Sequence, residues 1–95
     1  MSYKSKFFKS ALKEWEKLDP YIRNQFKAHL KKRLENPRLE SARLKGYPNL
    51  YKIKLQALGY RLAYSVEDQE LCVYVISVGR RDKMFEILHQ RLSKS

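Results

Sequence analysis

The chain has 95 residues, 43% of them hydrophobic and 13% aromatic, which predicts one folded domain over residues 1–95 rather than a disordered chain. It carries 21 lysines and arginines against 10 aspartates and glutamates, a net charge of +11. This excess of positive charge favours an anionic partner, such as nucleic acid, an acidic protein or an anionic membrane surface, over a simple role in solubility.

The expected compartment follows from features that the sequence lacks. The N-terminus has no apolar core of the kind found in signal peptides, and no apolar stretch approaches the roughly 20 residues needed to span a bilayer. Cys72 is the single cysteine, so no disulfide can form within the chain. We therefore expect a cytoplasmic protein that is neither secreted nor held in a membrane.

The N-terminal segment predicts a short strand followed by a helix. Residues 3–8 include three aromatic side chains and favour the strand. Leu12, Trp15 and Leu18 recur at helical spacing, which predicts a helix over residues 9–18. Because Trp15 lies on this stripe, we interpret it as an anchor of the core rather than as a platform on which bases stack.

A second helix is predicted to begin at Asp19 and Pro20 and to end before Pro37. Aspartate caps a helix N-terminus and proline fits its first position, whereas the residue before a proline resists the helical conformation. The apolar face of this helix holds Ile22, Phe26, Leu30 and Leu34, and its basic face holds Arg23, Lys27, Lys31 and Lys32. The basic face is either solvated or rests on a nucleic-acid backbone.

The second half of the chain predicts a loop, three strands and a C-terminal helix. The expected elements are loop 37–49, strands 50–55, 60–66 and 71–78, and helix 82–92. The strand 71–78 is apolar on both faces, which places it inside the sheet with both faces covered. The apolar stripe of the C-terminal helix consists of Phe85, Leu88 and Leu92.

These elements predict an α+β fold in the order β-α-α-β-β-β-α. Helices and strands are separated along the sequence, which is typical of an antiparallel sheet with helices packed on it. We expect the N-terminal αα-hairpin to cover one face of that sheet. The side chains expected at the contact are Leu12, Trp15, Ile22, Phe26 and Leu30 from the helices, and Ile53, Leu55, Leu62 and Tyr64 from the strands.

Two of the predicted strands carry cations on one side. Apolar and basic residues alternate over residues 51–55, so Lys52 and Lys54 point away from the helices. If residues 56–59 close a hairpin, Lys54 lies directly opposite Arg61. Like charges that face each other destabilise a sheet, so we infer that these side chains are kept for a function.

Further cations are expected near this pair of strands. Arg80 and Arg81 directly follow the last strand, whose end lies beside the start of the preceding strand in an antiparallel meander. Either arginine is therefore expected to reach the same surface, and Lys45 is expected at its rim. No carboxylate pair, metal-ligand cluster or phosphate-binding glycine loop is visible in the sequence, so we expect neither a metal nor another cofactor.

Clustered cations suit the cleavage of RNA, which carries its own nucleophile, the 2′-hydroxyl. A base must take the proton of that hydroxyl, cations must stabilise the extra charge on phosphorus, and an acid must serve the leaving 5′-oxygen. Packed like charges lower a lysine pKa, and arginine matches the geometry of phosphate oxygens. The residues alone favour metal-independent RNA cleavage, although RNA binders without catalysis also carry basic sheet faces.

Several segments of the sequence resemble the RelE family of bacterial toxins. They are Leu44–Leu55, Gly59–Tyr64 and Val75–Asp82, with a further likeness upstream over Ala11–Leu18. The resemblance covers nearly the whole chain and matches its length and order of elements. It implies a RelE-like fold and a ribosome-dependent mRNA endonuclease. Such toxins cut the codon in the ribosomal A site, leave a 2′,3′-cyclic phosphate and inhibit translation.

The resemblance also implies roles for individual residues. By matching position, Lys54 is expected to be the general base, Lys52 and Arg61 to stabilise the phosphate and the transition state, and Arg81 to serve the leaving oxygen. Lys45 stands where the family often has a basic residue, and we expect it to bind RNA together with Arg80 and Phe85.

The C-terminal segment departs from the family pattern. The family commonly places a tyrosine there to orient the substrate, whereas this chain has Ile87 near that position and Phe85 as the nearest aromatic residue. Phe85 either stacks on a base, without offering a hydroxyl, or packs on the core.

The expected partners follow from the resemblance and the charge. They are mRNA on the 70S ribosome with contacts to 16S rRNA, and a RelB-like antitoxin. Operator DNA is expected to be contacted only indirectly, through the antitoxin complex, and no membrane is expected as a partner. The antitoxin would either cover the basic surface or displace the helix 82–92.

Two other functions remain open. A relative on the same scaffold, like the ParE toxins that poison DNA gyrase, would cleave no RNA, and the joint presence of Lys52, Lys54, Arg61 and Arg81 argues against it. A module that binds RNA or ribosomes without chemistry is also conceivable. The sheet face lacks an obvious exposed aromatic pair for stacking bases, which disfavours an RRM-like binder.

Overall fold

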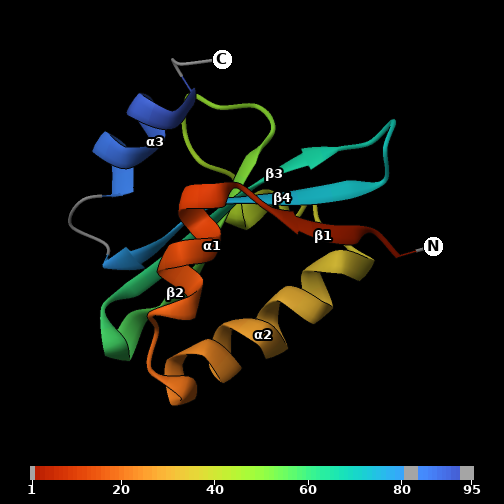
Figure 1. The fold of residues 1–95 in the computed structure, drawn as a ribbon. Helices are drawn as coiled ribbons and strands as arrows, with labels where there is room; N and C mark the ends of the chain where they lie inside the picture. The colour runs from red at the N-terminus through yellow and green to blue at the C-terminus, as the bar shows by residue number, and fades with distance from the viewer. Residues whose placement is uncertain (1, 81–83, 93–95) are drawn as a thin grey trace.

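The order of elements along the chain is the predicted one. The computed structural model describes residues 2–80 and 84–92, apart from the side chain of Phe85. The elements are β1 (Lys4–Phe7), α1 (Lys9–Glu16), α2 (Pro20–Glu35), β2 (Leu50–Leu55), β3 (Tyr60–Glu67), β4 (Cys72–Arg80) and α3 (Met84–Leu92), with short 3-10 turns at Glu40–Ala42 and Gln56–Leu58 (Figure 1). The α+β class and the order β-α-α-β-β-β-α are therefore confirmed.

The boundaries of α2 follow from its end residues. The side chain of Asp19 accepts a hydrogen bond from the backbone amide of Tyr21 at 2.9 Å, and Pro20 occupies the first helical position. The helix ends at Glu35, because Asn36 precedes a proline and adopts a non-helical conformation with φ −147° and ψ 76°. Both ends thus confirm the prediction from the sequence.

The sheet is mixed rather than wholly antiparallel. Its strand order is β1-β4-β3-β2, and the pairs β2–β3 and β3–β4 are antiparallel as predicted. β1 pairs with β4 in a parallel arrangement, because the whole αα-hairpin and meander separate the two strands in the chain. β4 therefore lies inside the sheet, and most of its side chains are buried on both faces, as its apolar sequence predicts.

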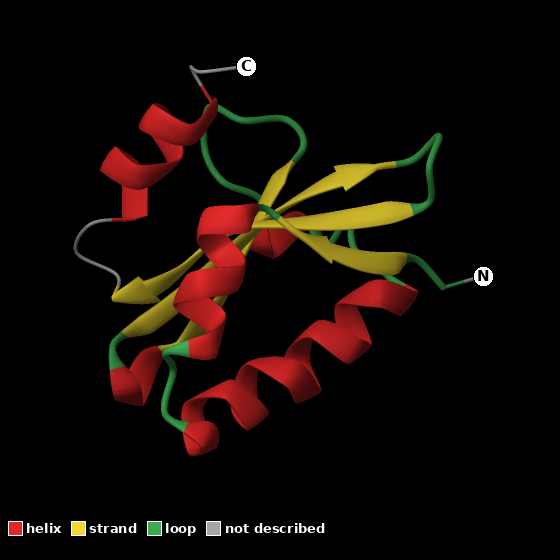
Figure 2. Cartoon of the chain, in the orientation of Figure 1, coloured by secondary structure: helices red, strands yellow, loops and turns green. Residues whose placement is uncertain are grey.

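Helices cover both faces of the sheet. α1 and α2 lie on one side and α3 lies on the other (Figures 1 and 2). The predicted contact of Leu12 with the sheet is wrong, because this side chain is 43% exposed, whereas Ala11 is fully buried. The face that meets the sheet runs through Ala11 and Trp15, and a small residue there lets α1 approach β4 closely. None of the helices in the described part of the chain is long and apolar enough to cross a membrane.

α3 completes a second, smaller core on the opposite face. Leu88 is fully buried and Leu92 is partly buried, which confirms two members of the predicted stripe. Met84 is also buried, whereas the side chain of Phe85 lies outside the described part of the chain. The residues that α3 meets are Leu44, Leu50, Ala63 and Ile76.

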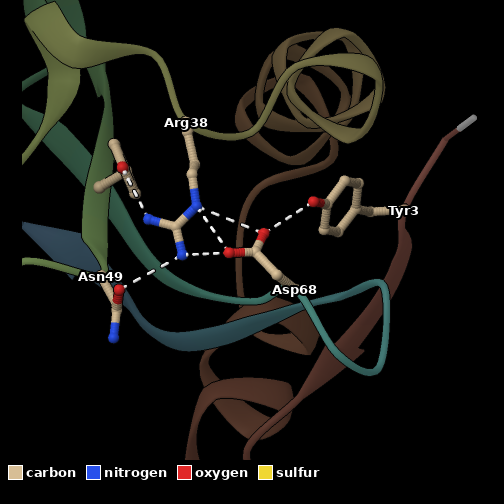
Figure 3. A network of polar contacts seen from close by, with 5 residues as sticks. Tyr3, Arg38, Asn49 and Asp68 are labelled. Carbon is tan, nitrogen blue, oxygen red and sulfur yellow. Dashed lines mark hydrogen bonds and ion pairs between the residues drawn. The ribbon is translucent and has the colours of Figure 1, made fainter.

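A polar network holds three loops together at one end of the sheet (Figure 3). Arg38, just after α2, donates to both carboxylate oxygens of Asp68 in the β3–β4 turn, the shortest contact being 2.6 Å. Its other donors bind Asn49 and the hydroxyl of Tyr51. Tyr3 donates to the same carboxylate at 2.7 Å and so attaches the N-terminal segment.

Candidate active site

The predicted hairpin forms with the predicted register. Lys54 lies directly opposite Arg61 in the β2–β3 ladder. The connection is the 3-10 turn Gln56–Leu58 followed by Gly59, whose φ of +70° lies in the left-handed region that favours glycine. This turn sets the register, and the register brings the two charges together.

Alternation along the strands places three cations on one face. Tyr51, Ile53 and Leu55 are buried in the core beneath α2. Lys52 and Lys54 therefore point to the other face, where Arg61 joins them from β3. We call Lys52, Lys54 and Arg61 the cationic patch.

The protein surface beside the cationic patch is open. Gly79 is the residue of β4 directly across from Arg61, and a Cβ atom added there would meet no atom within 4 Å beyond its chain neighbours. Ala63, opposite Lys52, is fully buried in the small core under α3, so the open surface does not extend over it. A glycine inside a strand often marks a place where a ligand approaches closely, so this surface has room for a substrate next to Arg61.

The charges of the patch are not compensated by any protein group that the structure describes. Within the described chain, none of the three side chains forms an ion pair or a side-chain hydrogen bond. Burial lowers the pKa of the Lys52 ammonium, and the nearby charges of Lys54 and Arg61 lower it further. An anion bound here would relieve this repulsion, and the amine of Lys52 releases its proton more readily than a free lysine.

Lys54 lines three hollows, and two of them include another cation of the patch. One of about 230 Å³ is lined by Lys52 and Lys54 together with Arg33 and Ser41. A smaller one of about 100 Å³ is lined by Lys54, Arg61 and residues of the turn. Cations that line two adjacent hollows can hold successive phosphates of one strand. Among the described residues, no group of three or more His, Cys, Asp or Glu side chains is arranged to hold a metal ion.

Arg33 is a neighbour of the patch that the sequence analysis missed. Its Nη1 donates to the carbonyl of Lys52 and to the hydroxyl of Tyr64, both at 3.0 Å, and so ties α2 to β2. The sequence held a signal for it, because Arg33 is seven residues after Phe26 and three after Leu30. A cation at that spacing lies on the apolar face of the helix and needs a partner there.

Arg80 does not lie with the patch. It is paired with Tyr60 across the β3–β4 ladder, and its guanidinium carbon lies 5.7 Å from the centre of the Tyr60 ring. Tyr60 packs against the core on the face covered by α1 and α2. Arg80 therefore lies on that face and not on the face of Arg61. The expectation that Arg80 reaches the patch is thus not met.

The structure describes only one of the remaining predicted site residues in full. Lys45 is exposed in the loop between the 3-10 turn Glu40–Ala42 and β2. Arg81 and the side chain of Phe85 lie outside the described residues, so their predicted roles stay predictions. Ile87, which falls near the place where the family resemblance leads us to expect a tyrosine, lines a separate hollow together with Tyr60 and Gly79.

Sequence comparison assigns the family. The family model described as the ParE toxin of the type II toxin–antitoxin system parDE matches residues 6–85. The chain is also 49% identical over 83 residues to the mRNA interferase toxin RelE of Escherichia coli K12, and this match spans 87% of both chains. The chain belongs to the RelE/ParE family of type II toxins. The mRNA interferase RelE of Shigella flexneri matches this toxin with the same identity and coverage.

Solved structures agree with this family and confirm the RelE-like fold. A mutant of Escherichia coli RelE in the free state superposes with a TM-score of 0.88 at 44% identity, covering 99% of this toxin and 98% of that chain. RelE in the intact RelBE toxin–antitoxin complex gives a TM-score of 0.81 at 49% identity, covering 83% and 96% of the two chains. The meander that carries the cationic patch therefore belongs to a shared toxin scaffold.

Proposed function

We propose that this toxin is a ribosome-dependent, metal-independent mRNA endonuclease. The observation that carries the proposal is the cationic patch itself, in which Lys52, Lys54 and Arg61 lie close together on an open surface and form no ion pair within residues 2–80 and 84–92. The 49% identity to proteins named mRNA interferase supports the same conclusion.

The reaction needs no nucleophile from the protein. The 2′-oxygen of the RNA attacks the adjacent phosphorus and gives its proton to a lysine amine, and the bond from phosphorus to the 5′-oxygen breaks. The 5′-oxygen takes up a proton, which leaves a 2′,3′-cyclic phosphate and a 5′-hydroxyl. Arg61 and a protonated lysine stabilise the extra negative charge on the phosphorus oxygens in between. Arg81 is proposed to serve the leaving oxygen.

Either lysine of the patch is suited to accept the proton. The family resemblance favours Lys54 as the base and Lys52 as a stabilising cation. The pKa of Lys52 is lowered, first by burial and then by the charges of Lys54 and Arg61, in the direction that a lysine base requires. We assign the base role to Lys54, and variants of both lysines decide between them.

The ribosome is proposed to supply the alignment of the substrate. The patch is an open surface on a strand pair, and it has few groups that could hold a flexible RNA with the 2′-oxygen in line with the leaving oxygen. Alignment of reacting groups contributes several kcal/mol to catalysis, on the order of 7 to 11 in favourable cases. A ribosome that presents the codon in a fixed conformation provides this term, with contacts of basic residues to 16S rRNA.

An antitoxin like RelB is the proposed protein partner, in the cytoplasm. The related structure of the RelBE complex pairs RelE with an antitoxin. The net charge of +11 suits an acidic segment that folds on the toxin surface. Contact with operator DNA would then occur only through the antitoxin complex.

The decisive experiment uses ribosomes programmed with a short mRNA and with a copy that carries a 2′-deoxy sugar at the cut site. The proposal expects cleavage of the first RNA, protection of the second and no effect of EDTA. Cleavage of the deoxy copy, or loss of activity with EDTA, would contradict the mechanism.

Lys54→Ala tests the assigned base. We expect cleavage to fall by about 100- to 10,000-fold, the usual range for a general base, while association with ribosomes persists. Lys13→Ala, which removes an exposed lysine of α1, is the matched control and should leave cleavage unchanged. A Lys54→Ala variant that cleaves like the wild type would remove this residue from the mechanism.

Inhibition of DNA gyrase is the second candidate function, because the matching family model is named for ParE. This function requires neither a crowded lysine nor a 2′-hydroxyl. Inhibition of DNA supercoiling by gyrase, without cleavage of any ribosome-bound RNA, would establish it. Ribosome binding without either activity would instead indicate a module that binds RNA and lacks chemistry.

A further inference from the structure

Beyond the end of β1, the edge of β4 is covered by side chains rather than by another strand. β1 pairs with β4 only as far as Phe7 and Val75, and the amide of Phe8 donates to the carbonyl of Val75 at 2.9 Å. After this point the chain turns into α1. The following backbone groups of β4 would then be open on that side, and open edge groups need partners.

A bulge interrupts β4 at the same place. Ala63 pairs with Ser77 and Tyr64 pairs with Val75, so Ile76 is an extra residue without a cross-strand partner. A bulge bends its strand and changes the direction of the residues that follow.

Two side chains from distant helices take the place of the missing strand. Arg91 of α3 donates from Nη1 to the carbonyl of Ile76 at 2.8 Å. Glu14 of α1 accepts from the amide of Val78 at 3.2 Å. The same two side chains bind each other through two hydrogen bonds of 2.9 and 3.0 Å. The Glu14–Arg91 pair thus joins α1, β4 and α3 at one point.

This pair is better held than an ordinary surface ion pair. The side chains of Arg91 and Glu14 are only 20% and 28% exposed, and their paired hydrogen bonds fix both orientation and distance. The other ion pairs of the described chain involve side chains that are 38% to 75% exposed. Partial burial reduces screening by water and salt, so the Glu14–Arg91 pair constrains the backbone that it contacts.

The backbone of β4 that the Glu14–Arg91 pair contacts lies next to the cationic patch. Gly79 follows Val78 and lies opposite Arg61, next to the open surface beside the patch. We propose that the Glu14–Arg91 pair is a positioning element for cleavage, an inference that rests on the proposed function. It fixes the bulge and the edge of β4, and so sets where the end of this strand meets Arg61.

Arg91→Gln tests this role. A misplacement of about 1 Å can cost a reaction on the order of 100-fold, so we expect kcat on programmed ribosomes to fall about 10- to 100-fold. KM should stay within about threefold of the wild type, because the patch that binds RNA remains intact. Arg91→Lys keeps the charge and one donor for the carbonyl of Ile76, and it should restore part of kcat.

Arg38→Gln is the matched control. It removes an arginine that binds both oxygens of Asp68 at the opposite end of the sheet. We expect it to lower the melting temperature and to leave kcat unchanged. If Arg91→Gln lowers kcat no more than this control does, or raises KM instead, the positioning role is overturned.

A second measurement keeps the inference separate from the proposed function. Hydrogen exchange of the Val78 amide, followed by NMR, should accelerate in Arg91→Gln and, to a smaller extent, in Glu14→Gln, which also serves if Arg91→Gln does not fold. Unchanged exchange would overturn the inference even if the wild type is an active nuclease. If the wild type cleaves no RNA, the proposed function fails, and this exchange alone decides whether the pair holds the edge.

Discussion

Lys52 is the residue of the cationic patch whose pKa is lowered by its surroundings. Its backbone carbonyl is held by Arg33, and its side chain lies beside Lys54 and Arg61. Burial is the largest cause of its lowered pKa, and the two neighbouring charges follow. The protein therefore tolerates an unfavourable ammonium at this position, and bound phosphate would stabilise it.

Arg61→Gln should raise the pKa of Lys52. Removing a like charge favours the protonated amine, but burial remains, so the pKa should stay below that of a free lysine. NMR titration of the lysine side chain checks this. Arg43→Gln, which removes an arginine already paired with Glu40, should leave the pKa of Lys52 unchanged. An unaltered pKa in Arg61→Gln would show that these charges do not interact.

At the scale of elements, α2 both contributes apolar side chains to the core and holds β2 in place. Its start depends on one side-chain hydrogen bond from the amide of Tyr21 to Asp19. Its apolar face buries Phe26 and Leu30, and its last turn provides Arg33 to the patch strand. The position of the lysines thus depends on a helix whose limits are set by local sequence.

Asp19→Ala should lower the free energy of unfolding by about 1 kcal/mol, the usual cost of losing an N-cap. Asp19→Asn keeps an oxygen that accepts from the amide of Tyr21, and it should cost much less. Urea denaturation of both variants checks the difference. Equal losses in the two variants would show that the cap does not act through this hydrogen bond.

The network around Asp68 links elements that are far apart in the chain. Hydrogen bonds from Arg38, and then from Tyr3, lower the pKa of the Asp68 carboxyl. A carboxyl with a lowered folded-state pKa stabilises the protein above its unfolded value of about 3.9, and this contribution is lost as the pH falls through the folded value. The network should therefore weaken in acid.

Asp68→Asn should be less stable than the wild type at pH 7, and the difference should shrink as the pH falls below about 4. Urea denaturation over a pH series measures this. Glu67→Gln removes an adjacent exposed carboxylate that forms no ion pair within the described chain, and it should change stability little at any pH. A constant difference between Asp68→Asn and the wild type would contradict the argument.

At the scale of the whole molecule, charge is expected to govern association. A net charge of +11 on 95 residues attracts a polyanion from a distance, and binding then releases counterions. The patch provides chemistry only after this encounter. Association and catalysis are therefore expected to depend on partly different residues.

Affinity for ribosomes should fall steeply with salt, and Arg61→Gln should reduce the slope of log affinity against log salt by about one, the change expected for one lost phosphate contact. Binding measured at several potassium chloride concentrations checks this. An affinity that does not respond to salt would show that neutralisation of the RNA backbone does not dominate.

Much of this protein was determined by short-range sequence rules. The period of two along β2, together with the length of the turn before Gly59, was enough to predict that Lys54 faces Arg61. The ends of α2 followed from Asp19 and Pro20 at its start and from the residue before Pro37 at its end. These rules act over a few residues, so the local sequence contains all the information that they need.

Only the tertiary structure decided how distant segments meet. It turned Ala11 instead of Leu12 toward the sheet, and it placed Arg80 against Tyr60 on the far face from the patch. The Glu14–Arg91 pair joins residues 77 positions apart. Such contacts depend on how whole helices pack against the strands, and packing is a property of all the side chains together that no local pattern contains.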